Sequence, residues 1–388
     1  MIYWDNAATT WPKPSTVRFV TCKASELSGA NPGRAGHRMS LATAEQVYAC
    51  REAVANFFGL DDPAGVVFTA NCTASLNMVI NGLLKDGGRA LISDLEHNAV
   101  MRPLAALSPR NPRYDAVPWC ADEDELVERF RRAIRPDTKL LVCTHASNVF
   151  GVTLPIRRLG ELAHRYGLLF CVDAAQTAGV LPIDMEQDHI DYLCVAPHKG
   201  LYAPMGTGLL LCREKNLVPA WIRGGTGSHS LSWEQPVDLP DRLESGTPNV
   251  TGICGIRAGI QFVRDRGQAA LYQHEMRCLQ YVYDRVTEHP AIRLYTPRPQ
   301  MGRMVPVLSL NVGEIPSEQV AAMLDEQGIA VRAGLHCAPT AHRHFGTLEQ
   351  GTVRLAPSAF STEEEAENVC KVFLKIAKKT LHYKENMV

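Results

Sequence analysis

The alternation of short apolar runs with stretches of helical period, between about residues 40 and 260, most constrains how this chain folds. The apolar runs lie at residues 66–68, 90–92, 140–143, 168–172, 192–195 and 209–212. Helical spacing of apolar side chains appears at residues 41–58, 123–134 and 156–166, and Gly59 follows the first of these stretches as a helix stop. This pattern predicts βα units that feed a largely parallel sheet. We therefore expect an α/β fold.

A loop-rich passage at residues 224–249 interrupts the alternation, and a long helical pattern follows from Gly255 to about residue 288. We expect a large α/β domain at residues 15–257 and a small C-terminal α+β domain at residues 258–388, with segment 1–14 packing near the site. The small domain is predicted to contain strands at 305–312 and 329–332, a helix at 317–327 and a closing helix from Thr362. Ser361 or Thr362 would cap the closing helix, with Glu364 or Glu365 completing a capping box.

Charge and cysteine usage exclude several classes of function. The 40 Lys and Arg against 41 Asp and Glu give a net charge of -1, so there is no surplus of positive charge for nucleic acid or an anionic membrane surface. The start of the chain lacks a basic stretch that leads into an apolar run, and no apolar segment reaches the roughly 18 to 20 residues that cross a bilayer. The 12 cysteines form no CxxC pair, so the sequence predicts neither a zinc knuckle nor a disulfide framework. We expect a cytoplasmic protein.

Two polar clusters follow neighbouring apolar runs. Asp173-Ala174-Ala175-Gln176 comes after residues 168–172, and His198-Lys199 comes shortly after residues 192–195. Ligands of parallel sheets collect beyond the carboxyl ends of the strands. An acid and a lysine placed there suit pyridoxal 5'-phosphate (PLP), because the amine can bond to the cofactor aldehyde while the carboxylate keeps the pyridine nitrogen protonated.

These residues resemble class V aminotransferases, and specifically the cysteine desulfurase and selenocysteine lyase family. The similarity runs in order over nearly the whole chain, through the segments at residues 4–9, 68–77, 96–97, 147–151, 172–176, 197–199, 244–249 and 332–338. The resemblance implies the PLP-dependent transferase fold type I, with a mostly parallel seven-stranded sheet between helices. It also implies a homodimer.

The resemblance assigns roles around the cofactor. Lys199 would bond to the PLP aldehyde, Asp173 would pair with the ring nitrogen, Gln176 and Asn148 would bond the ring oxygen, and His97 would stack on the ring as acid or base. The phosphate is expected at the start of the helix after Asn71, held by Cys72, Thr73 and His198, with Thr247 reaching the phosphate of a neighbouring subunit. This chain has Ala196 and Cys72 where relatives carry hydroxyl residues, which predicts fewer bonds to the phosphate.

Cys337 lies in a loop, in the segment Arg332-Ala333-Gly334-Leu335-His336-Cys337-Ala338. An exposed loop thiolate can visit a cofactor and then present its product. By resemblance to the group with a compact catalytic loop, Cys337 would take sulfur from L-cysteine as a persulfide, leave L-alanine, and pass the sulfur to an acceptor protein or thiol. Arg354 would bind the substrate carboxylate, with Arg332, Asn148 and Ala8 as further contacts.

Four other interpretations stay open from the sequence. A selenocysteine lyase or another PLP β-lyase would depend less on Cys337. A catalytically silent protein of this fold would serve as a sulfur-carrier scaffold, and a simple transaminase would have no use for a loop cysteine. Metal binding by His336, Cys337, His342 and His344 is a further alternative, although their spacing lacks a partner pair.

Overall fold

The computed structural model describes residues 1–27, 29–33, 36–108, 110–213 and 217–385, and its main element is a sheet of seven strands in the order β2-β8-β7-β6-β5-β3-β4. These strands are β2 (Val66–Thr69), β3 (Arg89–Ser93), β4 (Tyr114–Val117), β5 (Thr138–Thr144), β6 (Leu169–Asp173), β7 (Tyr192–Val195) and β8 (Gly208–Cys212). Neighbouring strands from β7 through β6, β5 and β3 to β4 are parallel, and β8 is antiparallel to both β7 and β2. The predicted α/β fold with a mostly parallel sheet is confirmed.

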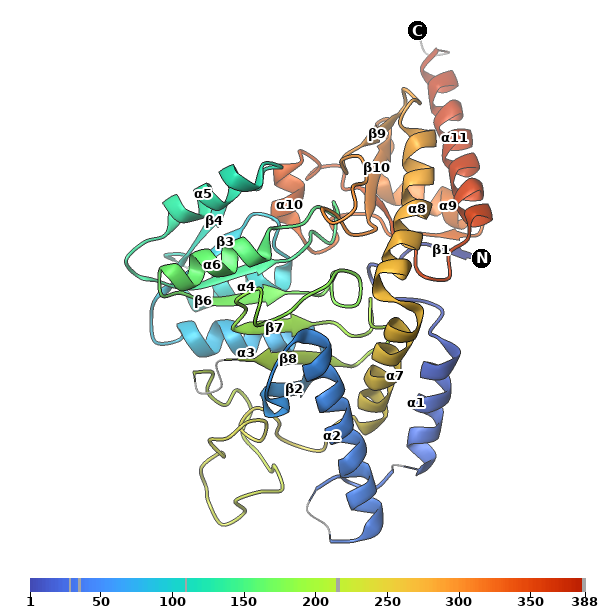
Figure 1. Cartoon of the computed structure of the whole chain (residues 1–388). Helices are drawn as coiled ribbons and strands as arrows, with labels where there is room; N and C mark the ends of the chain where they lie inside the picture. Colours follow the sequence, from blue (N-terminus) through green and yellow to red (C-terminus); the bar gives the residue numbers. More distant parts are fainter. Residues whose placement is uncertain (28, 34–35, 109, 214–216, 386–388) are drawn as a thin grey trace.

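Helices cover both faces of this sheet (Figure 1). One face packs on α2 (Arg38–Phe58), α5 (Glu123–Ala133), α6 (Ile156–Arg165) and α7 (Val250–Arg266), and the other packs on α3 (Cys72–Leu84) and α4 (Asn98–Leu107). Leu141 belongs to the first core and Val142 to the second, because successive side chains of a strand point to opposite faces. Burial on both faces explains why these strands are continuously apolar.

Glycines end two of the predicted helices. Gly59 follows α2 with φ of 64°, and its N–H bonds to the carbonyl of Ala55. This is the left-handed helix end that glycine adopts at little cost. The single helix expected from residue 255 to 288 is instead two, α7 and α8 (Gln268–Val286), which Gly267 separates with φ of 78°. The apolar period continues across Gly267, so the pattern alone concealed the break.

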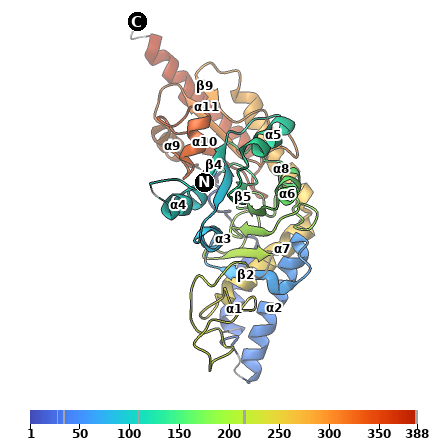
Figure 2. The same ribbon diagram turned by 90° about the vertical axis from the view of Figure 1, so that its left-hand side faces the viewer.

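The C-terminal elements build a second core, which lies at one end of the molecule in both views (Figures 1 and 2). An antiparallel sheet of order β12-β10-β9 packs against α8, α9 and α11, and β1 pairs in parallel with β11. The bounds are β1 (Ile2–Tyr3), β9 (Ile292–Leu294), β10 (Leu308–Val312), β11 (Ile329–Ala330), β12 (Val353–Leu355), α9 (Ser317–Asp325), α10 (Pro339–His344) and α11 (Glu363–Glu385). Trp4 is fully buried in this core, so the start of the chain is part of it.

Some predicted boundaries differ from the structure. The strand expected at 305–312 begins only at Leu308, because Pro306 has no N–H to donate to a sheet. Strands β4 and β9 were not predicted, since their sequences YDAV and IRL contain charged residues in short runs. The proposed domain boundary after residue 257 lies inside α7, which continues to Arg266, and that boundary remains a prediction.

Helix α1 (Ser15–Leu27) packs beside α7. The described residues between β8 and α7 form a long excursion without helix or strand, which is shown in olive in Figures 1 and 2. Across the described part of the chain, every helix is too short or too polar to cross a membrane.

Candidate active site

The two polar clusters predicted from the sequence meet at the carboxyl ends of β6 and β7. Asp173 is the last residue of β6 and lies in register with Cys194 of the parallel strand β7, while Lys199 follows β7 in a turn. A pocket of about 530 Å³ opens at this edge. The predicted site residues that line it are Cys72, Thr73, His97, Asn148, Asp173, Gln176, His198 and Lys199. The parallel sheet therefore brings together side chains that are up to 127 residues apart (199 − 72).

The Lys199 side chain is placed in a setting that favours its neutral amine. Burial lowers the pKa of Lys199 to about 8, and the positive charges of Arg354 and Arg332 act in the same direction. The Asp173 carboxylate opposes this change. Because the neutral amine is the nucleophile, the surroundings of Lys199 suit an attack on an aldehyde near physiological pH.

The carboxylate of Asp173 is held by two donors at the floor of the pocket. Its Oδ1 accepts a hydrogen bond from the backbone N–H of Ala175 at 2.9 Å and faces the Sγ of Cys72 at 3.5 Å. Burial is the main reason that the pKa of Cys72 lies well above its usual range, and the Asp173 charge adds to it. Cys72 is therefore a neutral thiol that donates to Asp173, and it is placed beside the carboxylate at the start of α3.

The beginning of α3 provides a place for an anion at the other end of the pocket. Asn71 caps the helix by accepting the N–H of Ala74 at 2.9 Å, and Thr73 lines the pocket in the first turn. Free N–H groups and the helix dipole favour a phosphate at such a position. Ala196 also lines this pocket and is 4% exposed, so its methyl group stands where the relatives' hydroxyl was expected.

His97 is fixed at the start of α4, where its Nδ1 accepts the N–H of Ala99 at 3.0 Å. The remaining ring nitrogen, Nε2, therefore carries the proton in the neutral form. Burial lowers the pKa of His97, although Asp173 raises it in part. The neighbouring Glu96 is fully buried and accepts the N–H of Thr144 at 3.0 Å, and burial raises its pKa to about 8. Glu96 thus ties the His97 turn to the end of β5.

The Cys337 segment is attached to the same pocket by its backbone. The Cys337 carbonyl accepts the N–H of Asn98 at 2.7 Å, and the His336 carbonyl accepts Nδ2 of Asn148 at 2.8 Å. His336 and Cys337 have φ of 47° and 59°, a left-handed conformation that is strained for side chains of this kind. His336 is buried and Cys337 is exposed. The tertiary structure therefore holds the thiol at the surface, next to the helix that begins after His97.

Arg354 is fully buried below this segment, at 1% exposure. Its Nη1 donates to the Asn148 carbonyl at 2.9 Å, and its Nη2 donates to Oδ1 of Asp5 at 2.8 Å. Arg332 lies beside it, since the two backbones form an antiparallel bridge. Asp5 was not among the predicted site residues, although the sequence signal was available because it lies within the 4–9 motif.

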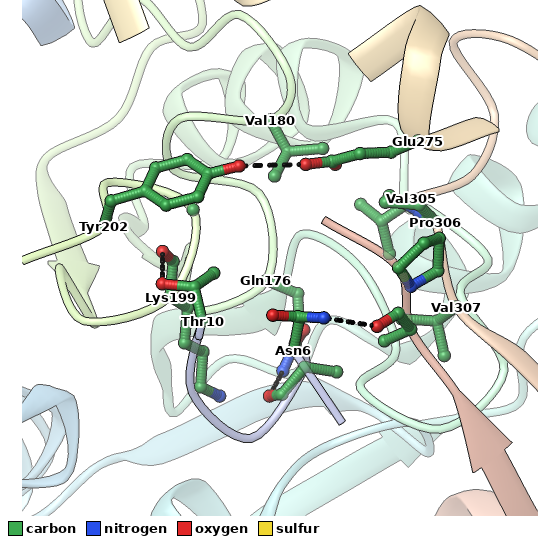
Figure 3. Close-up of a pocket in the computed structure, with 14 residues that line it drawn as sticks. Asn6, Thr10, Gln176, Val180, Lys199, Tyr202, Glu275, Val305, Pro306 and Val307 are labelled. Carbon is green, nitrogen blue, oxygen red and sulfur yellow. Dashed lines mark hydrogen bonds between the residues drawn. The ribbon is translucent and has the colours of Figure 1, made fainter. Parts of the chain in front are cut away.

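A second cavity of about 370 Å³ lies beside Lys199 and shares Lys199 and Gln176 with the first (Figure 3). Here Nε2 of Gln176 donates to the Ala7 carbonyl at 3.1 Å, and the hydroxyl of Tyr202 donates to Glu275 at 3.0 Å. Burial raises the pKa of Glu275 to about 8. Ala8, a predicted substrate contact, forms a turn with Asp5 next to this cavity through its own N–H.

Thr247 lies apart from these two cavities. It lines a separate hollow with Arg51, Glu244 and residues 225–227, and so does not join the cluster around Lys199 in the same chain. The histidines considered as metal ligands are turned to other partners: His336 to the Thr352 carbonyl, His342 to Thr347, and His344 to Asp94. In the residues that the structure describes, no group of three or more His, Cys, Asp or Glu side chains is arranged to hold a metal.

The pocket residues fit PLP as a set. An amine, a buried carboxylate, an imidazole and a helix start match the aldehyde, ring nitrogen, ring face and phosphate of the cofactor. Oδ1 of Asn148 is buried and has no hydrogen-bond partner in the protein, so the pocket contains an unsatisfied polar atom at the place where the cofactor ring is expected.

Comparisons with known proteins agree with this geometry. The sequence profile of the family described as aminotransferase class-V matches residues 2–369. A probable cysteine desulfurase of Methanothermobacter thermautotrophicus is 32% identical over 97% of this chain and 94% of its own length. A probable cysteine desulfurase of Synechocystis sp. is 28% identical over 99% of this chain and 91% of its own length.

Solved structures give the same result. The apo structure of a cysteine desulfurase from Thermococcus onnurineus superposes with a TM-score of 0.89 at 30% identity, covering 97% of this chain and 95% of that one. The cysteine desulfurase CsdA from Escherichia coli gives a TM-score of 0.86 at 26% identity, covering 97% and 94%.

Proposed function

Because the chain belongs to the aminotransferase class-V family, we propose that it is a PLP-dependent cysteine desulfurase that converts L-cysteine to L-alanine and carries the sulfur as a persulfide on Cys337. One observation supports this most strongly. The pocket that contains Lys199, Asp173 and His97 is joined to the segment that presents an exposed cysteine by two hydrogen bonds, one from the Asn98 N–H and one from the Asn148 side chain. A transaminase has no use for such a thiol.

Each residue has a task in the proposed reaction. PLP, when bound, supplies an electron sink that makes the substrate Cα–H acidic. Lys199 and Asp173 would hold the cofactor, Thr73 and His198 its phosphate, and Asn148 and Gln176 its ring oxygen. Arg354 would orient the substrate through its carboxylate, and Lys199 would take the α-proton once its amine is free.

Sulfur transfer then depends on Cys337. Its thiolate attacks the substrate sulfur, so that an S–S bond forms while the C–S bond breaks and its electron pair stays with the carbon fragment. A proton delivered to that carbon gives alanine, and His97 would donate it through Nε2, because its Nδ1 already accepts the Ala99 N–H. The sulfur leaves Cys337 when an acceptor protein or thiol attacks the outer sulfur atom.

Mass spectrometry of Cys337 after incubation with L-cysteine tests the proposal. We expect one added sulfur on Cys337, and we expect Cys337→Ala to abolish alanine formation while the cofactor absorbance persists. Cys22→Ala is the matched control, because Cys22 is also exposed but lies in α1. If Cys337→Ala retained full turnover of cysteine, the persulfide mechanism would be wrong and a β-lyase, such as a selenocysteine lyase, would replace it.

We also propose that the protein works as a homodimer in which Thr247 contacts the phosphate of the neighbouring subunit. The excursion between β8 and α7 supports a partner surface, since it exposes large apolar side chains at Trp221, Ile222, Leu231, Trp233 and Val237. Sedimentation of the holoenzyme should give twice the monomer mass of 42.7 kDa. We propose a cytoplasmic location, where thiols are kept reduced.

A further inference from the structure

The ion pair between Asp5 and Arg354 leaves one nitrogen of the guanidinium without a partner in the protein. The Arg354 guanidinium is 1% exposed, and a buried cation needs a compensating charge. Asp5 provides it through Oδ1, at 2.8 Å from Nη2, with a side chain that is 21% exposed. Nη1 is fixed by the Asn148 carbonyl at 2.9 Å. The Nε–H is buried and has no partner in the protein. The guanidinium is thus held through its two terminal nitrogens, Nη1 and Nη2, while its third nitrogen, Nε, has no partner in the protein.

The backbone around Asp5 places its carboxylate firmly. Asp5 forms a parallel bridge with Ala356, two residues beyond Arg354, and the Ala356 N–H donates to the Trp4 carbonyl at 2.7 Å. The side chain of Asn6 donates to the Ala356 carbonyl at 2.9 Å. The buried Trp4 anchors the segment in the C-terminal core. Asp5 and Arg354 thus lie on neighbouring, hydrogen-bonded backbone segments. The orientation of the Arg354 guanidinium is therefore set before a substrate binds.

Two positive charges act together on Lys199, which lines the pocket. Arg332 and Arg354 are neighbours, and both lower the pKa of Lys199. Within the described part of the chain, Asp5 is the one carboxylate in an ion pair with either arginine. Two guanidinium groups therefore share one carboxylate partner, and the net positive charge that remains would attract a substrate carboxylate.

We propose that Asp5 is a positioning residue for substrate binding: it fixes the Arg354 guanidinium so that the unpaired Nε–H edge receives the carboxylate of an α-amino acid. The proposal rests on the proposed function, because it assumes that an amino acid occupies the pocket. It adds a residue that acts through Arg354 and touches neither the cofactor nor the reacting sulfur.

Steady-state kinetics of the holoenzyme with Asp5→Asn, Asp5→Glu and the control Asp61→Asn test the role of Asp5, with Asp61 chosen as an exposed aspartate. Asp5→Asn keeps the shape and removes the charge. We expect it to raise KM for L-cysteine by about tenfold, as for the loss of a charge-assisted hydrogen bond, with kcat within about twofold of the wild type. Asp5→Glu should restore part of the loss, and Asp61→Asn should match the wild type.

Two binding measurements separate positioning from general damage. L-Alanine carries the carboxylate but no sulfur, and its binding, followed by the change in cofactor absorbance, should weaken in Asp5→Asn by the same factor as KM rises. Cysteamine lacks the carboxylate, so its binding should be unchanged in the variant. Equal weakening for both ligands, an unchanged KM, or a lower KM in Asp5→Asn would each overturn the proposal.

These outcomes are distinct from a failure of the proposed function. If the wild type bound L-alanine but did not desulfurate cysteine, the desulfurase proposal would fail, and the comparison of L-alanine with cysteamine would still decide the role of Asp5.

Discussion

At the scale of single residues, burial sets the protonation of the groups around the pocket. Removal from water disfavours the charged form, so it lowers the pKa of Lys199 to about 8 and raises the pKa of Glu96 to about 8. Both pKa shifts favour the neutral form, an amine at Lys199 and a carboxylic acid at Glu96. The carboxylate of Asp173 remains paired with the Ala175 N–H and the Cys72 thiol.

The pKa of Lys199 predicts how the apo-protein takes up its cofactor. The neutral amine attacks the aldehyde, so the rate of reconstitution with PLP should rise with pH through a midpoint near 8, below the ordinary lysine value of 10.5. Stopped-flow absorbance measures this rate, with Lys199→Ala as the control for other amines. A midpoint near that of an ordinary lysine would show that the surroundings do not favour the neutral form.

Ala196 provides a second residue-scale prediction. Ala196→Ser adds a hydroxyl to a residue that lines the cofactor pocket. The variant should therefore bind PLP more tightly, with a Kd lower by about two- to tenfold for one added hydrogen bond. Equilibrium dialysis measures the constant, and the exposed Ala121→Ser is the matched control. An unchanged or higher Kd would mean that the position does not face the phosphate.

At the scale of elements, local sequence determines most clearly where a helix begins or ends. Helix α11 begins with the predicted capping box: Thr362 Oγ1 accepts the N–H of Glu365 at 3.1 Å, and Glu365 Oε2 accepts the N–H of Thr362 at 3.1 Å. Of the alternatives, Thr362 and Glu365 are the pair that forms. The same helix packs in the C-terminal core through Ala366, Val369 and Phe373.

Loss of the cap should loosen the start of α11. Thr362→Ala removes the acceptor for the Glu365 N–H and should lower the local stability by about 1 kcal/mol. Hydrogen exchange of the amides in the first turn measures this change, and Thr362→Ser is the control that keeps the hydroxyl oxygen. Equal protection in Thr362→Ala and wild type would contradict the assigned cap.

At the scale of the whole molecule, two cores are joined around the pocket. The hydroxyl of Tyr202, which follows β7, donates to Glu275 of α8 at 3.0 Å (Figure 3). The same hydroxyl accepts the N–H of Ala359 at 3.2 Å. The N-terminal segment makes a second connection, since Thr10 Oγ1 donates to the Lys199 carbonyl at 3.1 Å while Trp4 lies in the C-terminal core. The second cavity, beside Lys199, thus lies where both connections meet.

Glu275 predicts how stability depends on pH. Its folded-state pKa of about 8 lies above the ordinary 4.5, so its favourable contribution is complete below about pH 4.5 and is lost as pH rises toward 8. Glu275→Gln cannot ionise, so its free energy of unfolding should fall less than that of the wild type between these pH values, by about 1 kcal/mol or more. Denaturant titration at several pH values measures this difference, and the exposed Glu288→Gln is the control. Parallel pH profiles for Glu275→Gln and wild type would refute the assignment.

Much of this arrangement was predictable from local patterns. Six strands of the main sheet, the end of α2, the start of α11, and the placement of Asp173 and Lys199 in one pocket followed from apolar runs, capping residues and the rule that ligands gather at strand ends. The short strand β4 and the break at Gly267 were not predicted, because weak or continuous apolar periods do not mark them. The roles of Cys337 and Arg354 came from resemblance, since a lone cysteine or arginine carries no signal of its own.

The sequence by itself determined the α/β class, most of the elements, and the residue types that suit PLP, because each depends on neighbours within a few positions along the chain. Only the tertiary structure decided that Asp5 meets Arg354, 349 positions away (354 − 5), that the Asn148 side chain bonds to His336, and that Glu275 is buried near Lys199. Contacts of this kind depend on how separate strands and helices pack together. Burial by that packing, rather than the identity of the side chain, then shifts the pKa values on which the proposed chemistry rests.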